Sequence, residues 1–259
     1  MQNTALITGA SAGIGRELAI IHAEKGGDLV VVARRQEQLE DLKAELESRH
    51  GIKVRVLVFD LTDRGAPSAV YQQLKDEDIE IEILINNAGF GGVGKFHQRD
   101  WNEDLAMIHL NVLALTELTR LFLPDMITRR SGKILNVSST ASLMPGPLQA
   151  VYFATKAFVT SLSNALAYEL RGTGVTVSAL LPGATGTEFA RVSGMERSPL
   201  FQKTASARRV AEEGYNGMLS GRLNIISGLS LWQRFRLAFV PLLPKSIVMS
   251  EVKKLQQTR

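Results

Sequence analysis

Short runs of apolar residues recur along the chain, and glycine, proline or charged residues end most of them. Runs of about four to eight apolar residues are typical of buried strands, because both faces of a central strand are covered. The predicted strands span residues 4–8, 28–33, 52–59, 80–85, 133–137, 175–180 and 224–227.

Segments with a different apolar spacing separate these strands. Leu39, Leu42 and Leu46, for example, recur every three or four residues, as on the buried face of a helix. The predicted helices span residues 16–25, 36–49, 64–76, 101–129 and a segment that carries Tyr152 and ends near residue 171. Regular alternation of strand and helix predicts a single-domain α/β fold, a Rossmann-type doubly wound parallel sheet of about seven strands with helices on both faces.

The first predicted strand leads into a glycine-rich turn, Gly9–Gly15, with the sequence GASAGIG. A strand, such a turn and a helix form a phosphate-binding arrangement, since glycines let backbone N–H groups approach a pyrophosphate and the helix N-terminus favours negative charge. The spacing is GxxxGxG rather than the commoner GxGxxG. The turn also matches the G-x-S-x-G nucleophile elbow of hydrolases. That elbow needs an earlier strand to supply an N–H group to its oxyanion hole. This turn follows the first predicted strand, so the hydrolase interpretation is disfavoured.

The end of the second predicted strand indicates which dinucleotide binds. An acid there hydrogen-bonds the ribose 2′-hydroxyl of NAD, whereas an arginine accommodates the 2′-phosphate of NADP. Ala33 takes the place of the acid here, and Arg34 and Arg35 follow. We therefore predict NADP(H), with Arg34 as the main phosphate contact and Arg35 as a weaker one. The alternative is that the arginines only solvate the start of a helix.

Tyr152 and Lys156 lie four residues apart, on one face of a predicted helix. A phenol ordinarily has a pKa of about 10, and a nearby ammonium lowers this pKa by favouring the phenolate. The pair is therefore a candidate for acid–base catalysis near neutral pH. Such pairs also occur by chance on many surface helices. The motifs upstream therefore determine whether this pair is interpreted as catalytic.

Those motifs, taken in order, resemble the short-chain dehydrogenase/reductase (SDR) family, and the two arginines resemble its NADP-preferring type. The motifs are Thr8-Gly9-x-x-x-Gly13-Ile14-Gly15, Asn86-Asn87-Ala88-Gly89, Ser139 thirteen residues before Tyr152, Tyr152-x-x-x-Lys156 and Pro182-Gly183. They follow the family's order and spacing across roughly residues 4–187. Each motif is weak alone, but the ordered set is specific.

The resemblance implies catalytic roles for the matching residues. Tyr152 would be the general acid in carbonyl reduction and the base in alcohol oxidation, and Ser139 would hydrogen-bond the substrate oxygen. Lys156 would hold the nicotinamide ribose and lower the Tyr152 pKa, and Asn111 would support a water relay. The adjacent hydroxyl of Ser138 competes with Ser139, but the spacing to Tyr152 favours Ser139. Asn111 could instead satisfy a neighbouring backbone group.

The resemblance also implies contacts to the cofactor along one edge of the sheet. Asp60 would meet the adenine, Asn87 would line the adenosine side, and Thr187 would meet the nicotinamide carboxamide. The predicted cofactor-binding residues are Gly9, Ser11, Gly13, Ile14, Gly15, Arg34, Arg35, Asp60, Leu61, Asn87, Ala88, Gly89, Tyr152, Lys156, Pro182, Gly183, Thr185 and Thr187.

Composition excludes several other classes of function. The net charge of +4 over 259 residues is scattered, which favours mild attraction of an anionic ligand over nucleic-acid binding. The chain has no cysteine, which excludes disulfides, thiolate zinc sites and thiol catalysis. Its four histidines show no metal-binding spacing, so no metal is expected. The absence of cysteine and of a signal-peptide pattern fits a cytoplasmic location.

Two tracts concern the substrate. Residues 184–205 are predicted to be a mobile lid, and their apolar residues are Phe189, Val192, Met195, Leu200 and Phe201. Further apolar lining is expected from Phe90, Phe96, Leu143, Met144, Pro145 and Leu148. We therefore expect a mainly apolar small-molecule carbonyl or alcohol substrate.

The catalytic domain is predicted to span residues 1–228, and residues 229–259 form an amphipathic helical extension of it. Trp232, Phe235 and Phe239 recur at helical spacing, and prolines at 241 and 244 then break the helix. Packing on the subunit or on a dimer partner is one interpretation. A helix that contacts a membrane surface weakly, or lines an apolar substrate entrance, is the other.

The sequence thus predicts an NADP(H)-dependent oxidoreductase that interconverts a carbonyl and an alcohol with a Ser-Tyr-Lys site, and that assembles as a homodimer or homotetramer. A ketone, aldehyde or oxoacyl group is the expected substrate. Two alternatives stay open. One is an NAD-linked alcohol dehydrogenase of the same fold, and the other is a non-catalytic nucleotide-binding or membrane-surface regulatory protein.

Overall fold

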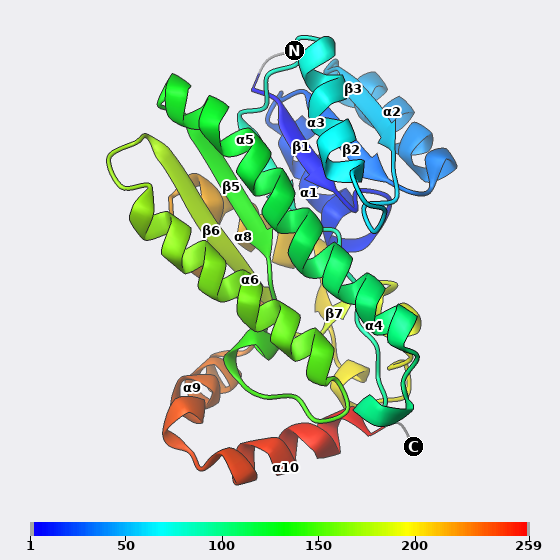
Figure 1. The fold of residues 1–259 in the computed structure, drawn as a ribbon, viewed down its shortest axis with the longest axis vertical. Coiled ribbons are helices and arrows are strands. Elements are labelled where there is room, and N and C mark those ends of the chain that lie inside the picture. The colour runs from blue at the N-terminus through cyan, green and yellow to red at the C-terminus, as the bar shows by residue number, and fades with distance from the viewer. Residues whose placement is uncertain (1–2, 258–259) are drawn as a thin grey trace.

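Within residues 3–257, which the computed structural model describes, seven parallel strands form one sheet in the order β3-β2-β1-β4-β5-β6-β9 (Figure 1). The strands are β1 (Ala5–Thr8), β2 (Leu29–Ala33), β3 (Val54–Val58), β4 (Ile83–Asn86), β5 (Gly132–Val137), β6 (Val175–Pro182) and β9 (Asn224–Ser227). A two-residue pair, β7 (Thr185–Gly186) with β8 (Ala205–Ser206), stands apart from this sheet. The predicted parallel α/β sheet is confirmed.

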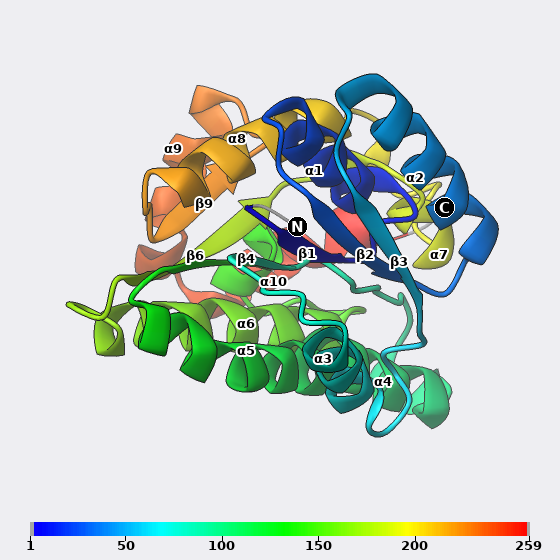
Figure 2. The same cartoon turned by 90° about the horizontal axis from the view of Figure 1, so that it is seen from above.

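Helices cover both faces of the sheet (Figure 2). One face packs against α1 (Gly13–Glu24), α2 (Gln36–His50) and α8 (Ala207–Leu219), and the other against α3 (Ala66–Asp76), α5 (Leu115–Arg129) and α6 (Ala150–Glu169). The remaining helices are α4 (Trp101–Ile108), α7 (Phe189–Val192), α9 (Leu231–Phe239) and α10 (Lys245–Gln256). Each face has its own apolar core cluster, because the side chains of a strand alternate between the two faces.

The order of the strands reverses between β1 and β4. Leu6 of β1 pairs with Val30 of β2 on one side and with Leu84 of β4 on the other. The loops that leave β1 and β4 therefore diverge at the carboxyl edge of the sheet, and this is where α/β sheets of this type bind ligands.

The helix predicted over residues 101–129 is continuous but not uniform. A π-helical turn, His109–Ala114, joins α4 to α5 and carries the buried Asn111. By length and composition alone this stretch could cross a membrane. Leu118, Phe122 and Met126 pack into the core beneath the sheet, so core packing accounts for part of its apolar character.

The C-terminal tail contains two helices rather than one. As predicted, α9 ends before the prolines, and a 3-10 turn, Val240–Leu242, follows it. The second helix, α10, was not predicted. Trp232, Phe235 and Phe239 of α9 are 67%, 54% and 44% exposed, so the aromatic row is not buried on its own subunit, and packing on a dimer partner or on a membrane stays a prediction.

His22 is a structural histidine that makes folding stability depend on pH. It is fully buried on α1, with Nδ1 2.7 Å from the Tyr215 hydroxyl and Nε2 2.8 Å from the Asn3 carbonyl oxygen. Burial lowers the pKa of His22 below its ordinary value of 6.5, against the opposing effect of the backbone hydrogen bonds. The unfolded chain therefore takes up this proton first as the pH falls.

We expect the free energy of unfolding to fall below pH 6.5 by up to about 1.4 kcal/mol per pH unit from this group alone. Urea unfolding of the wild type and of His22→Phe between neutral and mildly acidic pH measures the effect. The wild type should show the steeper loss, and parallel pH dependences would contradict the assignment.

Candidate active site

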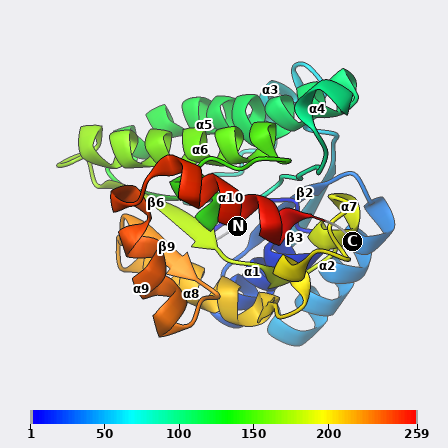
Figure 3. The ribbon, with the colours of Figure 1, turned by 90° about the horizontal axis from the view of Figure 1, so that it is seen from below.

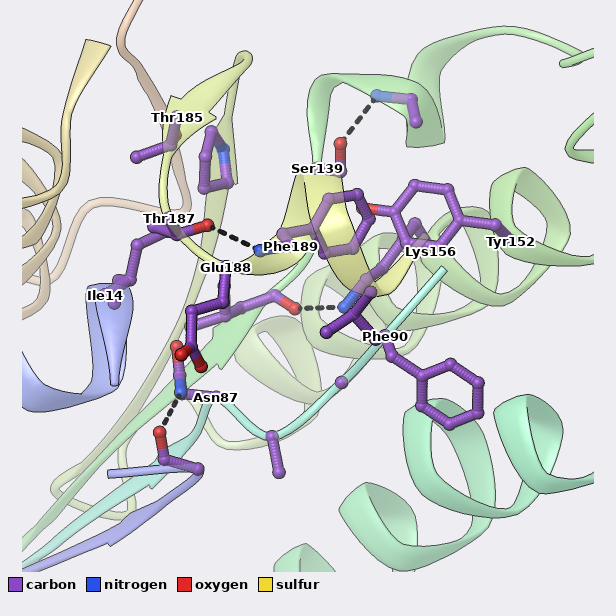
Figure 4. A pocket seen from close by; sticks show the side chains of 18 of the residues that line it. Ile14, Asn87, Phe90, Ser139, Tyr152, Lys156, Thr185, Thr187, Glu188 and Phe189 are labelled. Carbon is purple, nitrogen blue, oxygen red and sulfur yellow. Dashed lines mark hydrogen bonds between the residues drawn. The ribbon is translucent and has the colours of Figure 1, made fainter. Parts of the chain in front are cut away.

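A cavity of about 550 Å³ opens at the carboxyl edge of the sheet, where the strand order reverses. Residues of the loops after β1 to β6 line it, and residues of the lid tract and of α10 complete its wall. Figure 4 shows Asn87, Ser139, Tyr152, Lys156 and Thr187 around this space, with Tyr152 and Lys156 on one helix and the other three on separate loops. The cavity therefore lies at the carboxyl edge of the sheet, where the cofactor-binding residues were predicted.

The glycine-rich turn forms the floor of the cavity. Gly9 and Gly13 have φ angles of +68° and +57°, which favour glycine, and α1 begins at Gly13 with its N-terminus toward the cavity. A Cβ at Gly15 would collide with the Gly9 carbonyl oxygen and with the Asn87 side chain. The close approach of backbone to backbone explains the glycines, and the free N–H groups of the first helical turn suit a phosphate.

Asn87 supports this turn. Its Nδ2 donates to the Thr8 carbonyl oxygen at 2.9 Å, and its backbone N–H donates to the Thr8 hydroxyl at 3.0 Å. Asn87 also lines the cavity, as predicted, but its amide is engaged in holding the end of β1 against the end of β4.

The two arginines after β2 stand at one end of the cavity with carboxylate partners. Arg34 lies 3.4 Å from Asp60 and its side chain is 73% exposed. Arg35 donates to the Ser11 hydroxyl at 3.1 Å and lies 2.9 Å from Glu188. The structure therefore ties Arg35, rather than Arg34, directly to the glycine-rich turn.

The carboxylates at this end are ionised. Burial raises the pKa of Asp60, but hydrogen bonds from Thr62 and the charge of Arg34 outweigh it and leave the pKa below its usual range. The hydrogen bond from Arg35 likewise holds the pKa of Glu188 low. Sequence reasoning missed Glu188, although it is the residue directly after Thr187 in the lid tract.

Ser139, Tyr152 and Lys156 meet on the opposite side of the cavity. Tyr152 and Lys156 project from α6, and Ser139 precedes the 3-10 turn Thr140–Leu143 after β5. The Lys156 Nζ donates to the Val137 carbonyl oxygen at 2.8 Å and lies 6.0 Å from the centroid of the Tyr152 ring. The predicted spacing thus brings a phenol, a hydroxyl and an ammonium together.

The expected lowering of the Tyr152 pKa is wrong for the protein alone. Burial raises the pKa of Tyr152 to about 12, and the hydrogen bond with Ser139 offsets this only in part. Burial also lowers the pKa of Lys156 to about 8. The ammonium points at a carbonyl oxygen and not at the phenol oxygen, so desolvation dominates over charge attraction.

The structure also distinguishes Ser139 from Ser138 as the candidate catalytic serine and shows what Asn111 contacts. The Ser138 hydroxyl is buried in hydrogen bonds to the Lys156 carbonyl oxygen and to Thr160, which supports the choice of Ser139. Asn111 does not line the cavity. Its amide binds both backbone groups of Phe90, so it holds the loop after β4. Its role in a water relay stays a prediction.

The predicted cofactor residues lie around the same cavity, with Gly15 as the exception because it packs behind the glycine-rich turn. Thr187 lies directly above Gly13, since a Cβ at Gly13 would stand 3.0 Å from the Thr187 methyl group. Thr185 donates to the Gly183 carbonyl oxygen at 2.9 Å and so shapes the bend after β6. Their contacts to a cofactor stay predictions.

Apolar side chains of the lid tract form the substrate side of the cavity. The five predicted lid residues Phe189, Val192, Met195, Leu200 and Phe201 all line it. The centroid of the Phe189 ring lies 5.3 Å from that of Tyr152. Pairing of β7 with β8 joins the two ends of the lid. Phe90 and Met144 also line the cavity as predicted.

The other apolar residues predicted to line the substrate side lie elsewhere. Phe96 and Leu143 are exposed, and neither they nor Pro145 and Leu148 reach the cavity.

The tail contributes part of the cavity wall, in agreement with the interpretation that it lines an apolar substrate entrance, although α10 rather than the aromatic helix α9 forms this wall. Val252, Leu255 and Gln256 of α10 line the cavity. Gln256 is buried, and its Oε1 has no hydrogen-bond partner within residues 3–257. A buried amide oxygen without a partner is costly, so it marks a place where a ligand can donate a hydrogen bond.

Comparison with known proteins agrees with this geometry. A sequence profile of the family described as short chain dehydrogenase matches residues 3–197. The very-long-chain 3-oxoacyl-CoA reductase of Anas platyrhynchos is 31% identical over 209 residues, which are 77% of this chain and 64% of that protein.

Two solved structures match almost the whole chain. A short-chain dehydrogenase from Sphingobium yanoikuyae in complex with NADPH is 35% identical, with a TM-score of 0.83 over 98% of both chains. The bulky-bulky ketone specific alcohol dehydrogenase from Comamonas testosteroni is 30% identical, with a TM-score of 0.80 over 98% of this chain and 96% of that one.

The chain therefore belongs to the short chain dehydrogenase family, a class of oxidoreductases, as the motifs predicted. It spans 60–65% of the length of the first curated relatives that it matches.

Proposed function

We propose that the protein is an NADP(H)-dependent reductase of an apolar ketone, aldehyde or oxoacyl group. One observation carries this proposal. Ser139, Tyr152 and Lys156 line the same cavity as the glycine-rich turn and the two arginines. A protein that only binds a nucleotide has no use for a buried phenol and ammonium beside that nucleotide, so this observation favours an enzyme over a regulatory protein.

The residues around the cavity fit a dinucleotide. The turn and the N-terminus of α1 suit a pyrophosphate, and Arg34 and Arg35 suit a phosphate on the adenosine ribose. Arginine has five N–H donors, so either side chain can keep its carboxylate partner and still bind a phosphate. Ala33 at the end of β2 removes the acid that an NAD-binding site would use. The NADPH complex of the similar Sphingobium protein supports this assignment.

The protein's own groups handle the proton. Bound NADPH would supply a hydride to the carbonyl carbon. Tyr152 would donate its phenolic proton to the carbonyl oxygen, which completes the alcohol, while the Ser139 hydroxyl donates a hydrogen bond to that oxygen. The Lys156 ammonium, 6.0 Å from the ring centroid, would stabilise the phenolate that remains. Burial raises the pKa of Tyr152 to about 12, so the phenol is protonated at neutral pH, which is the form that reduction requires.

The apolar wall supports a bulky substrate. Phe189, Met195 and Phe201 of the lid tract line the cavity together with Val252 and Leu255 of α10. The names of two similar proteins, a bulky-bulky ketone specific alcohol dehydrogenase and a very-long-chain 3-oxoacyl-CoA reductase, agree with this class. We therefore propose a carbonyl with large apolar groups.

Titration of the purified protein with NADPH and with NADH, followed by cofactor fluorescence, tests the cofactor. Reduction assays with a bulky aryl ketone and with a 3-oxoacyl thioester then test the substrate class. Preference for NADH would favour the NAD-linked alcohol dehydrogenase, and binding of neither cofactor would favour a non-catalytic protein.

Glu188 should weaken NADPH binding in the wild type. Its carboxylate lies 2.9 Å from Arg35 and would repel a 2′-phosphate bound to the same guanidinium. We expect Glu188→Gln to bind NADPH about two- to fivefold more tightly, with NADH binding unchanged. Glu196→Gln, an exposed acid of the same tract that does not line the cavity, is the matched control. Equal gains for both cofactors would show that Glu188 acts on the lid instead.

Gln256 should select substrates with a hydrogen-bond donor far from the carbonyl. Gln256→Leu is expected to lower kcat/KM about tenfold for a ketone that carries a distal hydroxyl, because the hydroxyl then loses its partner in a buried site. A purely apolar ketone should react as well as with the wild type. The adjacent exposed Gln257→Leu is the control. Equal losses for both ketones would indicate a structural role.

A further inference from the structure

The helix α9 is well specified, yet it buries none of its side chains. The Ser230 hydroxyl accepts from the Gln233 N–H, and the Gln233 side chain accepts from the Ser230 N–H at 2.8 Å, a capping box that stabilises the helix start. Trp232, Phe235 and Phe239 form a row, with ring centroids 5.7 and 4.7 Å apart. An ordered aromatic row in water indicates a partner outside this chain.

The exposed apolar surface continues beyond α9. Figure 3 shows α9 and α10 along the same end of the molecule, and the segment between them is also apolar. We call this the tail surface; its exposed side chains are Leu231, Trp232, Phe235, Phe239, Leu242, Leu243 and Ile247.

The tail surface is also where the positive charge of the chain gathers. Residues 229–259 hold six of the 30 Lys and Arg residues and only one of the 26 Asp and Glu residues. The rest of the chain is nearly neutral as a result. Arg234 pairs with Glu213, but within residues 3–257 no ion pair involves Arg236, Lys245 or Lys253. The apolar row therefore shares its helix with Arg236, a cation that is available to an anionic partner, and Lys245 and Lys253 follow on α10.

We propose that the tail surface binds the surface of an anionic lipid bilayer. Helices of this kind bury an aromatic and aliphatic face at the level of the headgroups and place Lys and Arg among anionic lipids. A second copy of the chain suits the surface less well, because a symmetric contact would bring two tails of the same net charge together.

Docking would bring the substrate cavity to the membrane. The opposite face of α10 lines that cavity through Val252 and Gln256, and Leu255 both lines the cavity and is 45% exposed. The helix α10 therefore contributes both to the rim of the cavity and, through Ile247, to the tail surface. An apolar carbonyl compound dissolved in the bilayer would reach the site without crossing water.

The two tryptophans of the chain give a direct test. Trp101 and Trp232 are 60% and 67% exposed, so each reports on its own surface when the other is replaced. With vesicles of phosphatidylcholine and phosphatidylglycerol, the emission of Trp101→Phe, which keeps Trp232, should shift to the blue, and salt should reverse the shift. The emission of Trp232→Phe, which keeps Trp101, should stay unchanged.

Substitutions then separate the apolar and ionic contributions in vesicle sedimentation. The double variant Phe235→Ser, Phe239→Ser should bind about tenfold more weakly or worse, and Arg236→Glu about fivefold more weakly or worse. Tyr168→Ser, a 68% exposed aromatic on α6, should bind as the wild type does. NADPH binding of every variant checks the fold, so the result does not depend on turnover.

Three outcomes would overturn the proposal. An unchanged Trp232 emission with vesicles, or an equal shift with phosphatidylcholine alone, would exclude an anionic bilayer as the partner. A Trp232 emission that is already blue-shifted without vesicles, in a dimer that Phe235→Ser and Phe239→Ser dissociate, would assign the tail surface to a second copy of the chain.

Discussion

Replacing Tyr152 with phenylalanine is expected to slow carbonyl reduction by about 10²- to 10⁴-fold while NADPH binds nearly as in the wild type. The substitution removes the phenolic hydroxyl and keeps the ring that packs against Phe153 and Phe189. Burial raises the pKa of Tyr152 to about 12, so the phenol carries its proton at neutral pH, and Ser139 is proposed only to hydrogen-bond the substrate oxygen. The Lys156 ammonium on the same side points at the Val137 carbonyl oxygen, and the carboxylates that line the cavity within residues 3–257, Asp60 and Glu188, lie at the arginine end.

Single-turnover reduction measures the chemical step, and a fluorescence titration measures the Kd for NADPH. Tyr168→Phe, which changes an exposed tyrosine near the far end of α6, is the matched control. Unchanged turnover of Tyr152→Phe would show that Tyr152 is not the proton donor. A large loss of NADPH affinity would instead show that the hydroxyl serves the binding of the cofactor.

The sheet and the position of the site follow from local patterns. Each strand is a short apolar run covered on both faces, so its identity depends on few neighbours in the sequence. The last strand, Asn224–Ser227, has the predicted bounds even though its surroundings depart from the family's usual ending. The loops of a parallel sheet must then meet at the carboxyl edge, and this places Gly9, Arg34 and Ser139 around one space.

What could not be predicted depends on contacts between distant segments. Glu188 meets Arg35 across 153 residues, and the pairing follows from how the lid folds back on the glycine-rich turn. The wall made by α10 has the same origin, since nothing in its sequence indicates that Gln256 is buried. The Tyr152 pKa follows the depth of burial and the direction of the Lys156 ammonium, and helical spacing determines neither.

Replacing both Arg34 and Arg35 with alanine is expected to weaken NADPH binding by about 10- to 100-fold and to leave NADH binding within about twofold of the wild type. A charge-assisted hydrogen bond to a phosphate contributes about 1.5–3 kcal/mol, and only NADPH carries the 2′-phosphate that we propose these side chains bind. Asp60 and Glu188 lose their ion-pair partners equally in both titrations, so this loss cancels in the NADPH/NADH ratio.

The single variants Arg34→Ala and Arg35→Ala rank the two contacts. The sequence favours Arg34, whereas the structure ties Arg35 to Ser11 of the glycine-rich turn and leaves Arg34 exposed. A larger loss for Arg35→Ala would therefore mean that anchoring at the turn matters more than position after β2. Arg64→Ala, which changes an exposed arginine that does not line the cavity, controls for net charge. If the double variant lost as much affinity for NADH as for NADPH, neither arginine would recognise the 2′-phosphate. That result would favour the NAD-linked alcohol dehydrogenase.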